Sequence, residues 1–244
     1  VPSQFDPRLE LVYLNAFANY DVLKKEFQPW SWLSKKMNEY NTRLGVKFLG
    51  FNIEGLTGIA SKKAVRKPLD PNVNKGVLTR VPFMNVYKSA AEAQGYRTIA
   101  LPYSDIARSM QDCTCDAVSS ISTGAALADL GGIMKYWYQL NYSQETESYL
   151  MSAKSWDKLS EEDLKVIYAE VAKASAKSIE QAQRNDKRNL EQMKKNGVQV
   201  FTYSETELLP LRRAIAENWK NLEPVMGRQL MNDARKHFLI NVKH

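Results

Sequence analysis

The stretch Gly76-Val-Leu-Thr-Arg-Val-Pro82 opens the part of the sequence that decides the fold. Two further apolar runs and two helical patterns alternate after it: a helical pattern at 85–94, Thr98-Ile-Ala-Leu-Pro102, a helical pattern at 104–111, and Cys115-Asp-Ala-Val-Ser-Ser120. Short apolar runs that alternate with helical patterns are typical of β-α-β-α-β units with parallel strands. We therefore predict an α/β fold whose central part is a parallel sheet.

A ligand site is predicted where these strands end. In open α/β sheets, ligands bind outside the carboxyl ends of the strands. Arg80 lies at the end of the first run, and Ser119 and Ser120 lie at the end of the third. A guanidinium group is a planar fork that can hold both oxygens of a carboxylate. Arg80 is therefore either a carboxylate anchor or a surface arginine paired with an acid, and the spacing alone does not separate the two interpretations.

The remaining elements follow from periodicity and from turn residues. We predict a loop leading into an extended segment at 1–15, strands at 45–51, 134–140, 147–153 and 198–203, and helices at 21–27, 30–40, 122–130, 207–222 and 227–238. Asn52-Ile-Glu-Gly55 is predicted to be a loop at the carboxyl end of its strand. As a second wall of the pocket, this loop makes Asn52 and Glu54 candidate ligand-binding residues.

A long helix is predicted after Ser160-Glu-Glu-Asp163, which has the pattern of a capping box. Apolar residues then recur at helical spacing until Gly197, a residue that commonly ends helices. A helix of about 35 residues spans roughly 50 Å. In a chain of 244 residues, such a helix must cross from one lobe to another.

The composition is that of an ordinary globular protein, with 44% hydrophobic and 25% charged residues and a net charge of +7. Lysines and arginines are mixed with acids, as on solvated helix faces, and no fingerprint of a nucleic-acid-binding fold occurs. We predict no nucleic-acid partner. No apolar run reaches the roughly 18 residues of a membrane helix. No signal segment opens the chain, so we expect that any targeting peptide has been removed or never existed.

Motifs for catalysis and for metal binding are missing. The sequence has no nucleophile elbow, Walker loop, zinc-protease motif or dinucleotide fingerprint. Its two histidines, His237 and His244, lie near the C-terminus, and Cys113 and Cys115 have a C-x-C spacing that fits neither zinc sites nor redox pairs. We predict free thiols, no enzymatic activity, no cofactor and no metal.

Several motifs resemble a known family. Four segments carry the resemblance: Lys75-Gly-Val-Leu-Thr-Arg-Val-Pro82, Leu101-Pro-Tyr-Ser-Asp105, residues 111–117, and residues 155–163 with the long helix. Their order and spacing resemble those of the solute-binding proteins of tripartite ATP-independent periplasmic (TRAP) transporters, of the C4-dicarboxylate-binding DctP type. The resemblance extends from the first residues to about Lys236.

The resemblance implies a two-lobed clamshell of the periplasmic-binding-protein kind, type II-like, with a long helix between the lobes. Lobe I would comprise residues 1–56 and 146–185, and lobe II residues 57–145 and 186–244. The family captures organic acids in the periplasm and delivers them to a membrane permease. Arg80 occupies the position of the family's arginine that pairs with the ligand carboxylate.

The sequence also departs from the family pattern. Ser120 replaces a family asparagine, Thr57 stands where a second arginine is frequent, and Asn52 stands where an aromatic residue is frequent. The family's opening strand-helix-strand segment has no counterpart here, so we expect lobe I to be incomplete. Three explanations stay open: a fragment, a second polypeptide that completes lobe I, or a structural or interaction subunit on the same fold that no longer binds solute.

Overall fold

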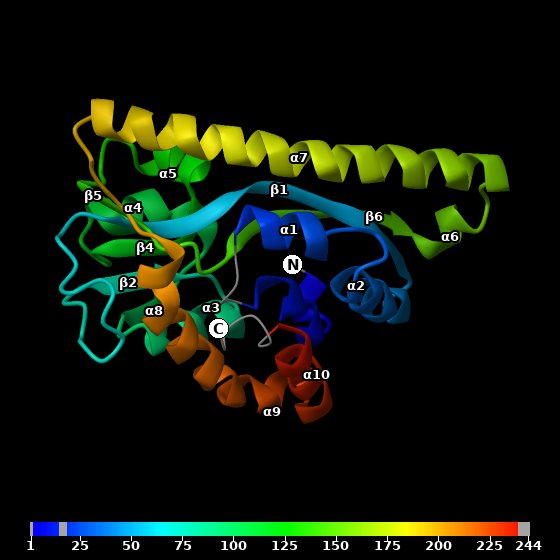
Figure 1. Ribbon diagram of the computed structural model, residues 1–244, viewed down its shortest axis with the longest axis horizontal. Helices are drawn as coiled ribbons and strands as arrows, with labels where there is room; N and C mark the ends of the chain where they lie inside the picture. The colour runs from blue at the N-terminus through cyan, green and yellow to red at the C-terminus, as the bar shows by residue number, and fades with distance from the viewer. Residues whose placement is uncertain (1, 15–18, 239–244) are drawn as a thin grey trace.

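The computed structural model describes residues 2–14 and 19–238, and its strands form one mixed sheet (Figure 1). Within these ranges the strand order is β3-β2-β4-β1-β5-β7, and β6 pairs with β1 outside this path. The strands are β1 (Val46–Ser61), β2 (Leu78–Val81), β3 (Arg97–Ala100), β4 (Ala117–Ser122), β5 (Tyr136–Gln139), β6 (Gln144–Ser152) and β7 (Gln199–Thr202).

The predicted β-α-β-α-β unit is confirmed. Strand β2 pairs in parallel with β3 on one side and with β4 on the other. The helices α3 (Asn85–Ala93) and α4 (Ile106–Gln111) connect these strands, and a short 3-10 helix, η3 (Tyr103–Asp105), precedes α4. Alternation of apolar runs with helical periods was sufficient to predict this unit.

The longest strand, β1, joins two parts of the molecule. Its residues 46–56 pair antiparallel with β6, and its residues 57–61 pair antiparallel with β4 and β5. The predicted loop at 52–55 is therefore wrong, because these residues continue the strand. Register shifts between Phe48 and Gly50 and between Ile53 and Gly55 place extra residues in β1 without ending it.

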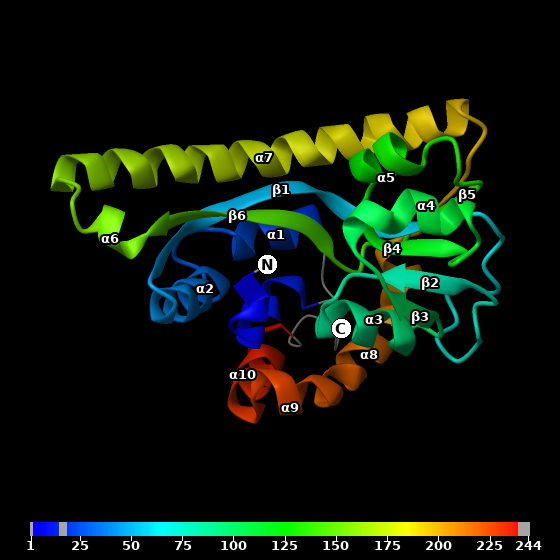
Figure 2. The same ribbon diagram turned by 180° about the vertical axis from the view of Figure 1, so that it is seen from behind.

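The helix α7 (Glu161–Lys195) lies along β1 over both parts of the sheet (Figures 1 and 2). Ser160 and Asp163 form the predicted capping box at its start. Two backbone N–H groups of β1 donate to α7 side chains, Ile53 to Ser178 Oγ at 3.0 Å and Leu56 to Asp186 Oδ2 at 3.1 Å. The helix thereby satisfies backbone groups where the ladder of β1 is irregular.

The other helices cover both faces of the sheet. They are α1 (Tyr20–Glu26), α2 (Trp32–Arg43), α5 (Thr123–Leu130), α6 (Ala153–Trp156), α8 (Glu205–Asn218), α9 (Glu223–Met226) and α10 (Arg228–Phe238), with the 3-10 helix η4 (Trp219–Leu222) between α8 and α9. One buried cluster joins the sheet to α3, α8 and the helices after it, and a second joins β4 and β5 to α4, α5 and the end of α7.

The start of the chain differs from its prediction. Within the described residues 2–14 it forms two 3-10 helices, η1 (Pro2–Gln4) and η2 (Pro7–Tyr13), and no extended segment; the prediction at Asn15 lies outside the described residues. Asp6 caps η2 by accepting from the Arg8 N–H, and Pro7 suits the first helical position. The apolar residues that suggested an extended segment are buried in the large cluster.

Candidate functional site

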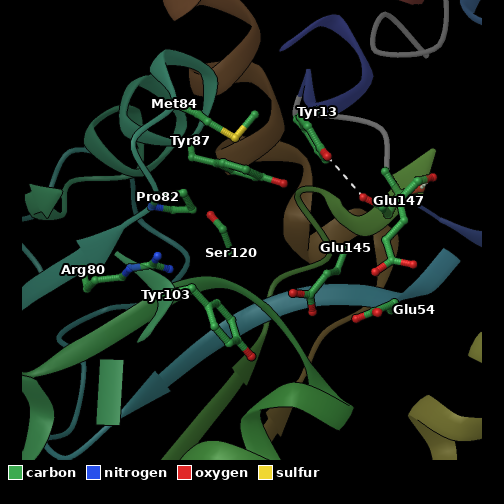
Figure 3. Close-up of a pocket in the computed structure, with 11 residues that line it drawn as sticks. Tyr13, Glu54, Arg80, Pro82, Met84, Tyr87, Tyr103, Ser120, Glu145 and Glu147 are labelled. Atoms are coloured by element: carbon green, nitrogen blue, oxygen red, sulfur yellow. Dashed lines mark hydrogen bonds between the residues drawn. The ribbon is translucent and has the colours of Figure 1, made fainter. Parts of the chain in front are cut away.

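A cavity of about 460 Å³ lies between the β2/β4 part of the sheet and the β1/β6 pair (Figure 3). This volume is in the range of small-molecule sites. Eleven of the described residues line it: Tyr13, Glu54, Arg80, Pro82, Met84, Tyr87, Tyr103, Ser120, Glu145, Thr146 and Glu147. Three of the five predicted site residues, Arg80, Ser120 and Glu54, are brought together here.

Arg80 projects into this cavity from β2, although its side chain is only 3% exposed. Its Nε donates to the carbonyl oxygen of Leu101 at 2.9 Å. Within the described ranges, no carboxylate lies within 4.0 Å of the guanidinium, and its two terminal nitrogens make no hydrogen bond. Burial lowers the pKa of Arg80 from its usual value. The interpretation of Arg80 as a surface arginine paired with an acid is therefore wrong for this conformation.

Ser120 lies on β4 with a backbone conformation that is rare outside glycine, φ +62°. The pairing of β4 with β1 skips Ser120, since Gly58 faces Ile121 and Ile59 faces Ser119. The Ser120 N–H donates instead to the hydroxyl of buried Tyr142 at 2.6 Å. This bulge turns Ser120 toward the cavity.

Ser119 and Asn52 do not line the cavity. Ser119 is fully buried, and its hydroxyl lies 2.9 Å from the Tyr142 hydroxyl. It therefore helps to fix the bulge from behind. Asn52 lies next to the site, where its Nδ2 donates to Glu147 Oε2 at 3.3 Å.

The wall opposite Arg80 carries three carboxylates, Glu54 on β1 and Glu145 and Glu147 on β6 (Figure 3). Residues two apart on a strand share a face, which places Glu145 and Glu147 together. The Glu145 Oε2 accepts the Ser122 N–H at 2.9 Å. Burial, followed by the charges of Glu145 and Glu147, raises the pKa of Glu54.

Aromatic side chains complete the cavity. The rings of Tyr13 and Tyr87 lie 5.3 Å apart, and the Tyr13 hydroxyl donates to the Thr146 carbonyl at 3.1 Å. Tyr103 donates to Asp129 Oδ2 at 2.6 Å. Sequence reasoning missed the tyrosines, Glu145 and Glu147. The alternation Glu145-Thr-Glu147 in a strand was a usable signal, whereas nothing local marked the tyrosines.

Among residues 2–14 and 19–238, no three His, Cys, Asp or Glu side chains form a group that could hold a metal ion. Cys113 and Cys115 are free thiols; we expected both to be partly buried, but Cys113 is exposed and Cys115 is buried. In the described part of the chain, no helix is both long and apolar enough to cross a membrane.

Comparison with known families matches residues 4–224 to the model of the bacterial extracellular solute-binding proteins of family 7, DctP. The chain belongs to this family. The DctP family consists of solute-binding proteins rather than enzymes, as the missing catalytic motifs predicted.

Solved structures of TRAP periplasmic solute-binding proteins have the same fold. One from Desulfovibrio salexigens, with bound orotic acid, is 20% identical, with a TM-score of 0.81 over 99% of this chain and 76% of that chain. One from Polaromonas sp. JS666, bound to D-erythronate, is 18% identical, with a TM-score of 0.76 over 96% of this chain and 75% of that chain. The predicted two-lobed α/β fold is thereby confirmed.

A curated relative is an uncharacterized protein of Haemophilus influenzae. It is 24% identical over 174 residues, which are 71% of this chain. The match covers 52% of that protein, so the chain spans about half the length of the curated relative it matches.

Proposed function

We propose that this DctP-family chain is a periplasmic receptor of a TRAP transporter that captures an organic acid in the cavity of Figure 3 and delivers it to a membrane permease. Arg80 is the carboxylate anchor, and Ser120 and Glu54 also contact the ligand. Asn52 and Ser119 support the site from outside the cavity, by holding Glu147 and Tyr142.

One observation carries the proposal: Arg80 is buried in a cavity wall, with 3% of the residue exposed, and has no acidic partner within the described ranges. An unpaired buried charge is costly, and a bound carboxylate offsets this cost with two parallel hydrogen bonds. The related structures support the choice of ligand, since one from Shewanella oneidensis holds succinate and the two described above hold D-erythronate and orotic acid. Each of these molecules carries a carboxyl group.

Binding of organic acids to the wild type and to Arg80→Ala tests the proposal. Calorimetry and thermal shift with a panel of organic acids should identify at least one ligand of the wild type. The substitution should weaken its binding about 100-fold or more, because it removes a desolvated charge-assisted pair. Arg80→Lys keeps the positive charge but loses the planar guanidinium fork. Its affinity should therefore lie between those of the wild type and Arg80→Ala.

Arg108→Ala is the matched control. The Arg108 side chain lies on α4, is 85% exposed, pairs with Asp112 and does not line the cavity, so this variant should bind like the wild type. If no organic acid stabilises the wild type, or if Arg80→Ala binds equally well, the receptor function is wrong, and the chain is better explained as a structural subunit on the same fold.

A further inference from the structure

The cavity is unbalanced in charge. The eleven lining residues that the structure describes include one cationic side chain, Arg80, and three carboxylates, Glu54, Glu145 and Glu147. Figure 3 shows the guanidinium on one side and the three carboxylates across from it. A second carboxylate on a ligand held by Arg80 would project toward like charges, which repel it.

Among the described residues, the three carboxylates have no cationic partner. Within residues 2–14 and 19–238, no lysine, arginine or histidine forms an ion pair with any of them. Their polar contacts are the Ser122 N–H to Glu145 and the Asn52 amide to Glu147. Each of these contacts uses one carboxylate oxygen, and the other oxygen has no hydrogen bond with a described residue. Glu54 makes no hydrogen bond with a described residue.

The mutual repulsion of these groups shows in Glu54. Burial is the main cause of its raised pKa, and the charges of Glu145 and Glu147 add to it. The same Glu145 charge acts across the cavity on Arg80. A cation placed between the carboxylates would relieve this repulsion, just as a carboxylate would pair with Arg80.

Metal ions fit this wall poorly, since the glutamates do not form a group that could hold one. An organic cation fits better, because an ammonium group can donate to several separated oxygens at once. The rings of Tyr13 and Tyr87 add aromatic faces to the same cavity, and such faces attract organic cations.

We propose, on the basis of the receptor function above, that the ligand of this chain is zwitterionic. Its carboxylate pairs with Arg80, and its ammonium or other organic cation is held by Glu145 and Glu54, with Glu147 contributing at the rim. Glu145 is the best-fixed of the three, because the Ser122 backbone holds one of its oxygens. The solutes that fit this charge arrangement best are therefore amino acids and betaines rather than dicarboxylates.

Calorimetry with matched pairs of acids tests this inference on the purified protein. The pairs are 4-aminobutyrate with glutarate, β-alanine with succinate, and glycine betaine with 3,3-dimethylbutyrate, an isostere that keeps the carboxylate but has a neutral tert-butyl group in place of the cation. Within each of the first two pairs, the carboxylate is constant and the other end changes from cation to anion. The zwitterionic member should bind about tenfold or more tightly in at least one pair.

Variants of the glutamates separate this inference from the receptor function. Glu145→Gln keeps an oxygen for the Ser122 N–H but removes the charge, so it should weaken binding of the preferred zwitterion about tenfold and strengthen binding of its anionic analogue. Glu54→Gln should act in the same direction. The control is Glu180→Gln, on the exposed face of α7, which should change neither affinity.

The possible outcomes differ for the two proposals. If only dicarboxylates or simple acids bind, and Arg80→Ala abolishes their binding, the receptor function holds and the zwitterionic ligand is wrong. If zwitterions bind but Glu145→Gln and Glu54→Gln leave their affinity unchanged, the assignment of the cation site is wrong. If no acid of either kind binds, the receptor function fails, and the zwitterionic ligand fails with it.

Discussion

Arg80 and Ser120 lie on strands that are hydrogen-bonded on both sides, whereas Glu54, Glu145 and Glu147 lie on the two-stranded β1/β6 ribbon. Strand β2 has β3 and β4 as neighbours, and β4 has β2 and β1. In the described part of the chain, β6 pairs with β1 alone, and α7 supports the ribbon through Ser178 and Asp186. The sheet therefore fixes one wall of the cavity, while the other wall depends on side-chain contacts with a helix.

Replacing Asp186 tests whether α7 supports the ribbon, and it should have the largest effect on stability. Asp186 is buried and accepts from Tyr20, from Thr123 at 2.6 Å and from the Leu56 N–H at 3.1 Å. Asp186→Ala should lower the free energy of unfolding by about 3 kcal/mol, because it leaves buried donors without acceptors. Denaturant titration measures this change.

Glu180→Ala is the control for that variant, since Glu180 lies on the same helix and is exposed. It should change the free energy of unfolding by less than about 0.5 kcal/mol. Equal effects of the two substitutions would show that α7 does not support the ribbon through Asp186.

Alanine substitutions at two glycines of β1 compare the two parts of this strand. A Cβ at Gly58 would lie 2.5 Å from the Trp137 ring and 2.6 Å from the Tyr138 carbonyl, which is backbone and cannot move aside. The atoms near a Cβ at Gly50 all belong to side chains: Val171 at 2.7 Å and Ser175 at 2.9 Å on α7, and Tyr149 at 3.9 Å on β6. Gly58→Ala should therefore destabilise the protein by about 2 kcal/mol, and Gly50→Ala by about 1 kcal/mol.

Thermal unfolding of both variants measures this difference. Gly132→Ala is the control, because a Cβ there meets no atom within 4 Å. A larger loss for Gly50→Ala than for Gly58→Ala would reverse the comparison and make the ribbon the more rigid part.

The smallest expected effect is on the titration of Glu54. Because Glu147 raises the pKa of Glu54, Glu147→Gln should lower this pKa toward the usual value of a glutamate. A carboxyl group whose pKa is raised by folding favours the folded state at low pH, and this contribution is lost as the pH rises through the raised pKa. The wild type should therefore lose slightly more stability than Glu147→Gln as the pH rises through the raised pKa of Glu54.

Carbon-detected NMR titration of the glutamate carboxyls measures the change, with Glu180→Gln as the control. An unchanged Glu54 pKa in Glu147→Gln would show that the two carboxylates do not interact, and the charge imbalance of the ribbon wall would then be weaker than its residues indicate.

The two walls also differed in how well the sequence predicted them. The β2-α3-β3-α4-β4 unit was predicted because its signals are local: apolar runs, helical periods and turn residues within 76–120. The same holds for α7, whose capping box and apolar period lie within the helix itself. Arg80 could be selected as a candidate because it lies at the carboxyl end of such a strand.

The ribbon wall was predicted only in part: Glu54 was a candidate residue of a second wall, but the strand that continues through it and the acids that face it were missed, because their signals are distant in sequence. Residues 52–55 continue β1 only because β6 pairs with them, as in the pair Asn52 and Glu147. A glycine and an asparagine between two apolar runs suggested a loop, and the partner strand outweighed that preference. Whether Glu54 faces Glu145 and Glu147 depends on the register between β1 and β6. Whether a described acid lies beside Arg80 depends on how segments distant in sequence pack together. Neither can be deduced from local sequence.

The continuity of β1 also affects how the molecule unfolds. Residues 46–56 of one strand bond to β6, and the next residues bond to β4 and β5 without a linker between them. Melting of either part alone would leave half of a strand stretched out in water while the other half is still held in the sheet. We therefore expect the two halves of the molecule to be coupled thermodynamically through this strand and to unfold in one cooperative transition.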